Sequence, residues 1–183
     1  MGLDRSVLLG AVERLHAEMQ TQFDVLNTAD GKLGDGDLGI TMTRGMEAIT
    51  EVVDDLPEDL GLALLKCSQA FTKSSGSSYG TLMALAMMAI AKQIKGKTMI
   101  APSDLNGLVV VARDQIQTRG KAEPGGKTVL DSLDAIVQRT SSKTDLEDIR
   151  AAATEAVDEA LACLLYTSPS PRDLSTSRMP SSA

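Results

Sequence analysis

Apolar residues recur every three to four positions along most of the chain, a pattern that predicts amphipathic helices. In the first stretch, residues 3–27, the apolar positions are Val7, Leu8, Val12, Leu15, Met19, Phe23 and Leu26. Further helices are expected over residues 41–53, 57–71, 81–94, 103–116, 129–137 and 144–162. No persuasive strand pattern separates them. The sequence therefore predicts an all-α protein of about seven helices.

The expected helix over residues 81–94 differs from the others because it is apolar on nearly every side. Its large apolar residues are Leu82, Met83, Leu85, Met87, Met88 and Ile90. A helix that is apolar all round is normally enclosed by other helices, so we expect this one to be central and buried. The next helix has a candidate N-cap in Ser103-Asp104.

Three connections between the expected helices are polar and rich in glycine: residues 28–40, 73–80 and 119–128. They are every second connection along the chain. In an up-and-down bundle of antiparallel helices, alternate connections lie at the same end. We therefore expect these three loops to gather on one face of the protein.

The first of these loops carries three carboxylates, Asp30, Asp35 and Asp37, within eight residues. Carboxylates this close repel one another unless a cation lies between them, and hard divalent ions prefer oxygen ligands. An EF-hand is excluded, because a loop that starts at Asp35 needs an acid and a glutamate at the positions where Gly39 and Met46 stand. A solvated turn is the plain alternative. An open magnesium site with room for phosphate oxygens fits the pattern better.

The second loop, residues 74–80, is either a flexible linker or a backbone cradle for an anion. Its small residues, Ser and Gly, precede the apolar helix, whose N-terminal N–H groups and dipole favour negative charge. The third loop ends in Gly-Lys-Thr, but it is not a P-loop. That motif needs glycine six residues before Lys127, where Lys121 stands, and Gly120 is one place too early.

The chain shows no apparatus for covalent or general-base catalysis. Its single histidine, His16, lies in the first expected helix, outside any motif. A site made of metal-binding carboxylates and phosphate cradles suits phosphoryl transfer, in which positioning and charge neutralisation do most of the work.

Composition narrows the class of protein further. Of 183 residues, 43% are hydrophobic and 2% aromatic, with no Trp, which suits helix-on-helix packing. The net charge of −7 without a basic cluster argues against a nucleic-acid partner, and no apolar run reaches the ~18 residues that span a membrane. Cys67 and Cys163 form no disulfide framework, so we expect a cytoplasmic protein with Cys67 in the core.

The last segment, residues 163–183, resembles a translated transposase sequencing adaptor followed by a flow-cell primer. It begins Cys163-Leu-Leu-Tyr-Thr-Ser-Pro-Ser-Pro-Arg-Asp173. A natural, disordered Ser/Pro-rich tail is the alternative. We expect one domain over residues 1–162, truncated at its C-terminus, with 163–183 a disordered artefact.

Taken together, the three loops resemble those of the nucleotide-binding L domain of the dihydroxyacetone kinase family, the DhaL type. The matching segments are Leu33-Gly-Asp-Gly-Asp-Leu-Gly-Ile-Thr-Met-Thr-Arg-Gly45, Ser74-Ser-Gly-Ser-Ser-Tyr-Gly80 and Arg119-Gly-Lys-Ala-Glu-Pro-Gly-Gly-Lys-Thr-Val-Leu-Asp131. Order and spacing agree over about residues 5–162. The resemblance implies an antiparallel up-and-down helical barrel of eight helices, with the nucleotide held by loops at one rim. The last helix is expected to be missing here.

The resemblance also implies roles for individual residues. Asp30, Asp35 and Asp37 would bind two Mg²⁺ ions that hold the phosphates of ADP or ATP. The residues expected to line the nucleotide are Leu38, Gly39, Ile40, Thr41, Ser74, Ser75, Gly120 and Thr128.

The function implied is that of a kinase subunit that carries the phosphoryl donor for a sugar ketone bound to a separate K subunit. The donor would be ATP itself, or a phosphotransferase-system protein that rephosphorylates bound ADP. A homodimer is also compatible with the resemblance. Two alternatives stay open: a regulatory module that binds nucleotide without transfer, and a structural helical domain.

Overall fold

The structure is a computed structural model that describes residues 2–32 and 34–166. The described part contains eight α-helices, one 3₁₀ helix and two short strands. In chain order they are β1 (Leu3–Asp4), α1 (Arg5–Thr21), α2 (Phe23–Asp30), α3 (Leu38–Thr50), α4 (Leu60–Ser74), α5 (Ser78–Gln93), β2 (Met99–Ile100), η1 (Pro102–Asp104), α6 (Leu105–Gly120), α7 (Val129–Thr140) and α8 (Leu146–Tyr166). The all-α fold predicted from the sequence is confirmed.

The first predicted helix is in fact two, which raises the number of helices from seven to eight. The helical stretch is interrupted at Gln22, whose backbone has φ −91° and ψ 4°. Just before it, the Thr21 hydroxyl donates to the carbonyl of Ala17 at 3.1 Å. A threonine that bonds back to the preceding turn bends a helix, so the prediction of one helix over 3–27 is wrong at this point.

The sequence pattern also did not predict a short antiparallel pair of strands, β1 and β2. Leu3 pairs with Ile100 and Asp4 with Met99, which ties the N-terminus to the connection between α5 and α6. Two residues per strand are too few to produce a visible alternation of apolar and polar positions.

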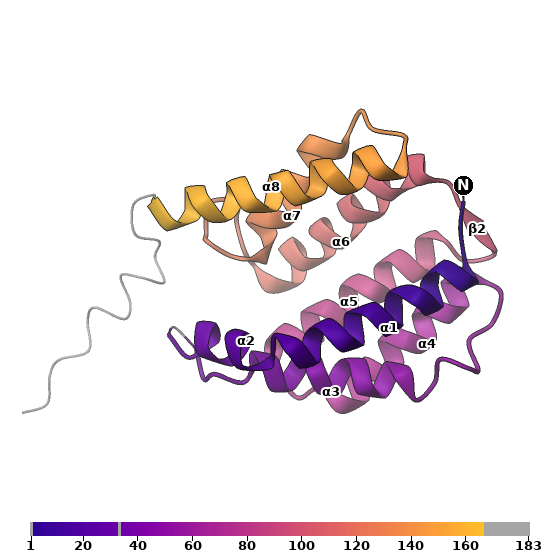
Figure 1. The fold of residues 1–183 in the computed structure, drawn as a ribbon, viewed down its shortest axis with the longest axis horizontal. Coiled ribbons are helices and arrows are strands. Elements are labelled where there is room, and N and C mark those ends of the chain that lie inside the picture. Colours follow the sequence, from indigo (N-terminus) through magenta and orange to yellow (C-terminus); the bar gives the residue numbers. More distant parts are fainter. Residues whose placement is uncertain (1, 33, 167–183) are drawn as a thin grey trace, which may run out of the picture.

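Successive helices pack side by side in antiparallel order, from α1 on α3 through α4, α5, α6 and α7 to α8. In this row each helix contacts the next, so α1 and α8 are its first and last members. The connections from α2 to α3, from α4 to α5 and from α6 to α7 all lie at the end marked by α2, and those from α3 to α4, from α5 to α6 and from α7 to α8 lie at the opposite end (Figure 1). The expectation that the three polar loops gather at one end is therefore confirmed.

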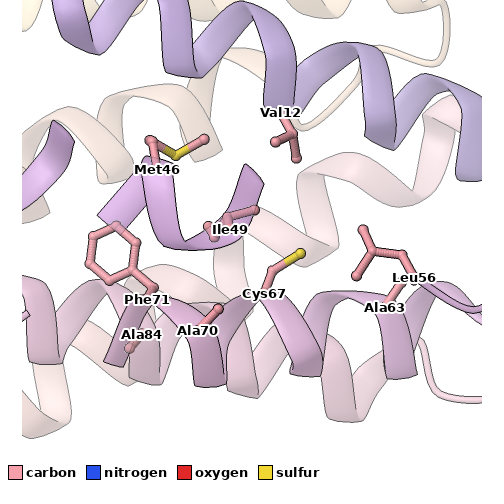
Figure 2. Close-up of a cluster of buried hydrophobic side chains, with 9 residues drawn as sticks. All are labelled: Val12, Met46, Ile49, Leu56, Ala63, Cys67, Ala70, Phe71 and Ala84. Carbon is pink, nitrogen blue, oxygen red and sulfur yellow. The ribbon is translucent and has the colours of Figure 1, made fainter. Parts of the chain in front are cut away.

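The main core lies between α1, α3, α4 and α5. Figure 2 shows Phe71 and Cys67 pointing from α4 toward Met46 and Ile49 on α3. Cys67 is only 2% exposed, as expected of a core residue, and burial raises the pKa of its thiol to about 11. This thiol is therefore neutral and shielded near neutral pH.

Helix α5 lies between α4 and α6, as predicted, but it is not buried all round. Its buried residues are small: Gly80, Ala84, Ala86 and Ala91. The large apolar residues predicted to be enclosed, from Leu82 to Ile90, are only partly covered. The reason is that α4 and α6 approach α5 closely along its small residues and leave the faces between them half open.

Two further expectations need correction at helix ends. Asp104 precedes α6, but its side chain makes no cap hydrogen bond and instead forms an ion pair with Lys97 at 3.5 Å. At the C-terminus, the last helix, expected over residues 144–162, is α8 and continues to Tyr166. The rest of the segment predicted to be an artefact, 167–183, lies outside the described residues.

Within the described residues, no helix combines the length and the apolar character needed to cross a membrane.

Helix packing makes a sharp prediction at Gly61. A Cβ at this position would stand 2.5 Å from the Cα of Lys95 and 2.6 Å from the carbonyl oxygen of Ala91, so α4 and the end of α5 would have to separate. We expect Gly61→Ala to lower the free energy of unfolding by about 1–3 kcal/mol in urea titrations. Gly107→Ala is the matched control, because nothing lies within 4 Å of its Cβ. That variant should be as stable as the wild type or gain up to about 1 kcal/mol; equal losses in both variants would contradict the packing.

Candidate functional site

The three acidic residues predicted to bind metal come together at the start of α3. Asp30 is the last residue of α2, Asp35 lies in the loop, and Asp37 precedes the first residue of α3. Each offers a carboxylate oxygen, and these oxygens lie within 4.8 Å of one another. Asp30 and Asp37 are half-buried, and Asp35 is exposed. Such a group can surround a divalent cation while leaving one side open.

Backbone hydrogen bonds hold Asp30 in place. Its Oδ2 accepts from the backbone N–H of Gly36 at 2.9 Å and from that of Asp37 at 3.0 Å. Gly36 has φ +77°, a conformation that other residues rarely adopt, so glycine is needed for the loop to turn back onto Asp30. Among the contacts of the described residues, both bonds use Oδ2, which leaves Oδ1 of Asp30 available to a cation.

The environment of the cluster disfavours a negative charge on Asp37. Burial, and then the negative charges of Asp35 and Asp30, raise the pKa of the Asp37 carboxyl above its usual value. Each cause disfavours the ionised form of Asp37, and a cation placed among the three carboxylates would reverse both charge effects.

Asn27, on α2, holds the start of α3 in place, and no sequence pattern singles this residue out. Its Oδ1 accepts from the backbone N–H of Gly39 at 2.7 Å and of Ile40 at 3.3 Å, at the first turn of α3. The side chain thus caps α3 from twelve residues away, whereas the recognisable capping patterns are local. The close approach also requires Gly39, because a Cβ there would lie 2.3 Å from the carbonyl oxygen of Phe23.

A hydrogen bond of Thr41 connects the second loop to the start of α3, which follows the first loop. Thr41 is 6% exposed, and its hydroxyl donates to the Ser77 Oγ at 3.0 Å. Ser77 is the N-cap of α5 and also accepts from the backbone N–H of Gly80 at 3.0 Å. Sequence reasoning did not select Ser77, since its role depends on a partner 36 residues away.

The two serines predicted to contact the nucleotide have different surroundings. The Ser74 hydroxyl donates to the carbonyl of Phe71 at 2.9 Å. The Ser75 Oγ is buried and makes no hydrogen bond, the one such side-chain atom in the described part of the chain. A buried hydroxyl without a partner is costly, so a hydrogen-bond partner brought to Ser75 would be stabilising.

The third loop connects α6 to α7 at the same end. Gly120 is the last residue of α6, and a Cβ built on it would lie 3.4 Å from the Leu82 side chain in the second turn of α5. Thr128 is the N-cap of α7: its hydroxyl accepts from the Leu130 backbone N–H, and a capping box joins it to Asp131. Leu82 thus places the start of this loop close to the second loop.

With this geometry established, comparison with known proteins identifies the family. The sequence profile of the DAK2 domain matches residues 32–179, which is most of the chain. The chain belongs to the DAK2 domain family. The predicted resemblance to the DhaL type is thereby confirmed.

Curated relatives of this DAK2 domain carry kinase names. It is 27% identical over 149 residues to the "PEP-dependent dihydroxyacetone kinase, ADP-binding subunit DhaL" of Escherichia coli, covering 80% of this chain and 71% of that protein. It is 32% identical over 152 residues to the human "Triokinase/FMN cyclase", covering 81% of this chain and 26% of that protein. A second DhaL subunit, from Listeria innocua, is 27% identical over 134 residues, and this chain covers 62% of its length.

Solved structures agree on the fold. The dihydroxyacetone kinase of C. freundii, crystallised with AMP-PNP and Mg²⁺, matches with a TM-score of 0.76 at 22% identity. The match covers 92% of this chain and 30% of that one.

The bracing by Asn27 can be tested without any ligand. Asn27→Ala leaves two N–H groups at the start of α3 without their acceptor, and we expect the free energy of unfolding to fall by about 1–2 kcal/mol. Thr28→Ala, at the next and exposed position of α2, is the control and should change little. Chemical denaturation followed by circular dichroism measures both. Equal stability of Asn27→Ala and the wild type would show that the cap is unimportant.

Charge repulsion predicts a gain in stability at Asp35. In metal-free buffer, Asp35→Asn removes one of the charges that act on Asp37, so the melting temperature should rise by roughly 1–3 °C. The gain should be present at pH 7 and disappear as the pH falls through the raised pKa of Asp37, because protonation of Asp37 removes its repulsion with Asp35. Scanning calorimetry at the two pH values is the measurement, and a lower melting temperature at pH 7 would contradict the repulsion.

Proposed function

We propose that this DAK2 domain is the ADP- or ATP-binding subunit of a dihydroxyacetone-type kinase. It holds the nucleotide through two Mg²⁺ ions and presents the phosphoryl donor to a sugar ketone bound on a partner K subunit. The observation that carries the proposal is the cluster of Asp30, Asp35 and Asp37 at the end where all three polar loops meet.

The donor set suits magnesium. All three side chains offer carboxylate oxygen, and within the described residues no histidine or cysteine belongs to the cluster, so the chemistry is that of a hard ion. The open side beside the exposed Asp35 leaves room for water and phosphate oxygens. When bound, Mg²⁺ neutralises phosphate charge and orients the phosphates for in-line transfer.

The chain's own residues are assigned separate tasks. Ser75 donates its hydroxyl to a phosphate oxygen, because its Oγ is buried and otherwise without a partner. Leu38 to Thr41 form a wall rather than a set of donors, since the N–H groups of Gly39 and Ile40 already bond to Asn27. Gly120 and Thr128 place the third loop beside the nucleotide.

The relatives' names support ADP as the nucleotide that stays bound. Besides the PEP-dependent enzyme of E. coli, a "PTS-dependent dihydroxyacetone kinase, ADP-binding subunit DhaL" of Lactococcus lactis is 28% identical over 141 residues. That match covers 74% of this chain and 71% of the relative. A phosphotransferase-system protein would then rephosphorylate the ADP. The acceptor pocket and the general base would belong to the K subunit. The one histidine here, His16, contacts Gln20 within α1 and does not belong to the acidic cluster.

Calorimetric titration of ADP tests the proposal. We expect binding that requires Mg²⁺ and that weakens more than about 10-fold in Asp35→Ala, which loses a metal ligand. Asp24→Ala is the matched control, because Asp24 is an exposed carboxylate of α2 outside the cluster. The control should bind ADP like the wild type. Binding that ignores both Mg²⁺ and Asp35→Ala would sink the proposal.

Transfer itself needs a second assay. The wild-type chain loaded with ADP and Mg²⁺ is mixed with a K subunit, dihydroxyacetone and the phosphoryl donor of a relative's system, and formation of the sugar phosphate is followed. Product formation supports the kinase subunit. Tight ADP binding without product would support the regulatory module instead.

A further inference from the structure

We infer that the hydrogen bond between Thr41 and Ser77 sets the spacing between the metal-binding and phosphate-binding halves of the site. Both would be positioning residues, acting through the elements that they connect. The inference rests on the proposed function, because it concerns the affinity of the same site for a magnesium–nucleotide complex. It adds Ser77, which the loop patterns did not select.

The bond joins the N-termini of two helices. Thr41 lies in the first turn of α3, where its backbone N–H donates to the carbonyl of Asp37 at 2.9 Å. Ser77 starts α5 as its N-cap. A shift of Ser77 relative to Thr41 would therefore move the start of α5 relative to a metal-binding carboxylate.

Close packing prevents the two loops from adjusting around the bond. A Cβ on Gly80 would stand 1.8 Å from the Ser75 Oγ and 3.1 Å from the Thr41 Cγ2, so the first turn of α5 lies directly against both residues. Thr41 is 6% exposed. The bond as a whole is partly buried, and a hydrogen bond shielded from water is stronger than an exposed one.

The chemistry of the ligand makes this spacing matter. The carboxylates of the first loop attract a cation, whereas the N-terminus of α5 and the Ser75 hydroxyl favour an anion. A diphosphate chelated to Mg²⁺ touches both halves at once, so its affinity depends on the distance between them. Binding of the metal to the carboxylates does not depend on that distance.

The test is ADP affinity at saturating Mg²⁺, measured by calorimetry on the full chain. Thr41→Val keeps the shape of the side chain and removes the hydroxyl, and we expect it to weaken ADP binding about 3- to 10-fold. Thr41→Ser should restore the affinity to within about 2-fold. The control is Thr43→Val on the same helix, whose hydroxyl donates to the Met19 carbonyl at 3.3 Å and not to the second loop.

ADP binding is also measured for Ser77→Ala and for the double variant Thr41→Val/Ser77→Ala, which together complete a double-mutant cycle. Because Thr41 acts through Ser77, the double variant should bind no more weakly than Ser77→Ala alone. Should Thr41→Val fail to fold by circular dichroism, the comparison of Ser77→Ala with the wild type and Thr43→Val carries the same expectation.

Each remaining outcome decides against the inference. Unchanged ADP affinity in folded Thr41→Val at saturating Mg²⁺ would overturn it, and so would a deficit that appears only at limiting Mg²⁺, because the bond would then act on the metal loop alone. If the wild type itself binds no ADP with Mg²⁺, the proposed function fails and the inference fails with it. The wild-type titration thus separates the two failures.

Discussion

Mutual repulsion among three carboxylates is the constraint on which the rest of this site depends. The oxygens of Asp30, Asp35 and Asp37 lie within 4.8 Å of one another. Burial, and then the charges of Asp35 and Asp30, raise the pKa of Asp37. Without other interactions, this repulsion would move the three carboxylates apart. The protein prevents this with hydrogen bonds from backbone N–H groups to Asp30 and with the cap that Asn27 places on α3. A cation bound among the three carboxylates would offset their repulsion.

The helical framework brings the other two loops to this cluster. Antiparallel packing puts alternate connections at one end, and small residues let the helices approach closely. Gly45 illustrates the second point, because a Cβ there would lie 2.1 Å from the Phe71 ring. The core of Figure 2 therefore fixes α3 against α4, and α4 leads directly into the second loop. Core packing and site geometry are parts of one arrangement.

The sequence predicted the features that depend on local pattern or simple topology. Helical periodicity predicted the helices. The position of the three loops at every second connection predicted that they share one end, and the density of aspartates predicted the cluster. Features that depend on distant contacts were missed. Asn27 caps a helix twelve residues later, and Ser77 meets Thr41 across 36 residues. The break at Gln22 was missed for another reason, because the bond from Thr21 back to Ala17 leaves the apolar spacing unchanged.

The most direct test of the account is to locate the metal by paramagnetic relaxation. Mn²⁺ replaces Mg²⁺ in the presence of ADP, and broadening of backbone amide signals is measured along the isotope-labelled chain. The account predicts the strongest broadening in residues 30–41, 75–80 and 120–128, and the weakest around Met99–Ile100 at the opposite end. Broadening centred away from the three loops, with ADP bound, would contradict the central claim that they form one metal–nucleotide site.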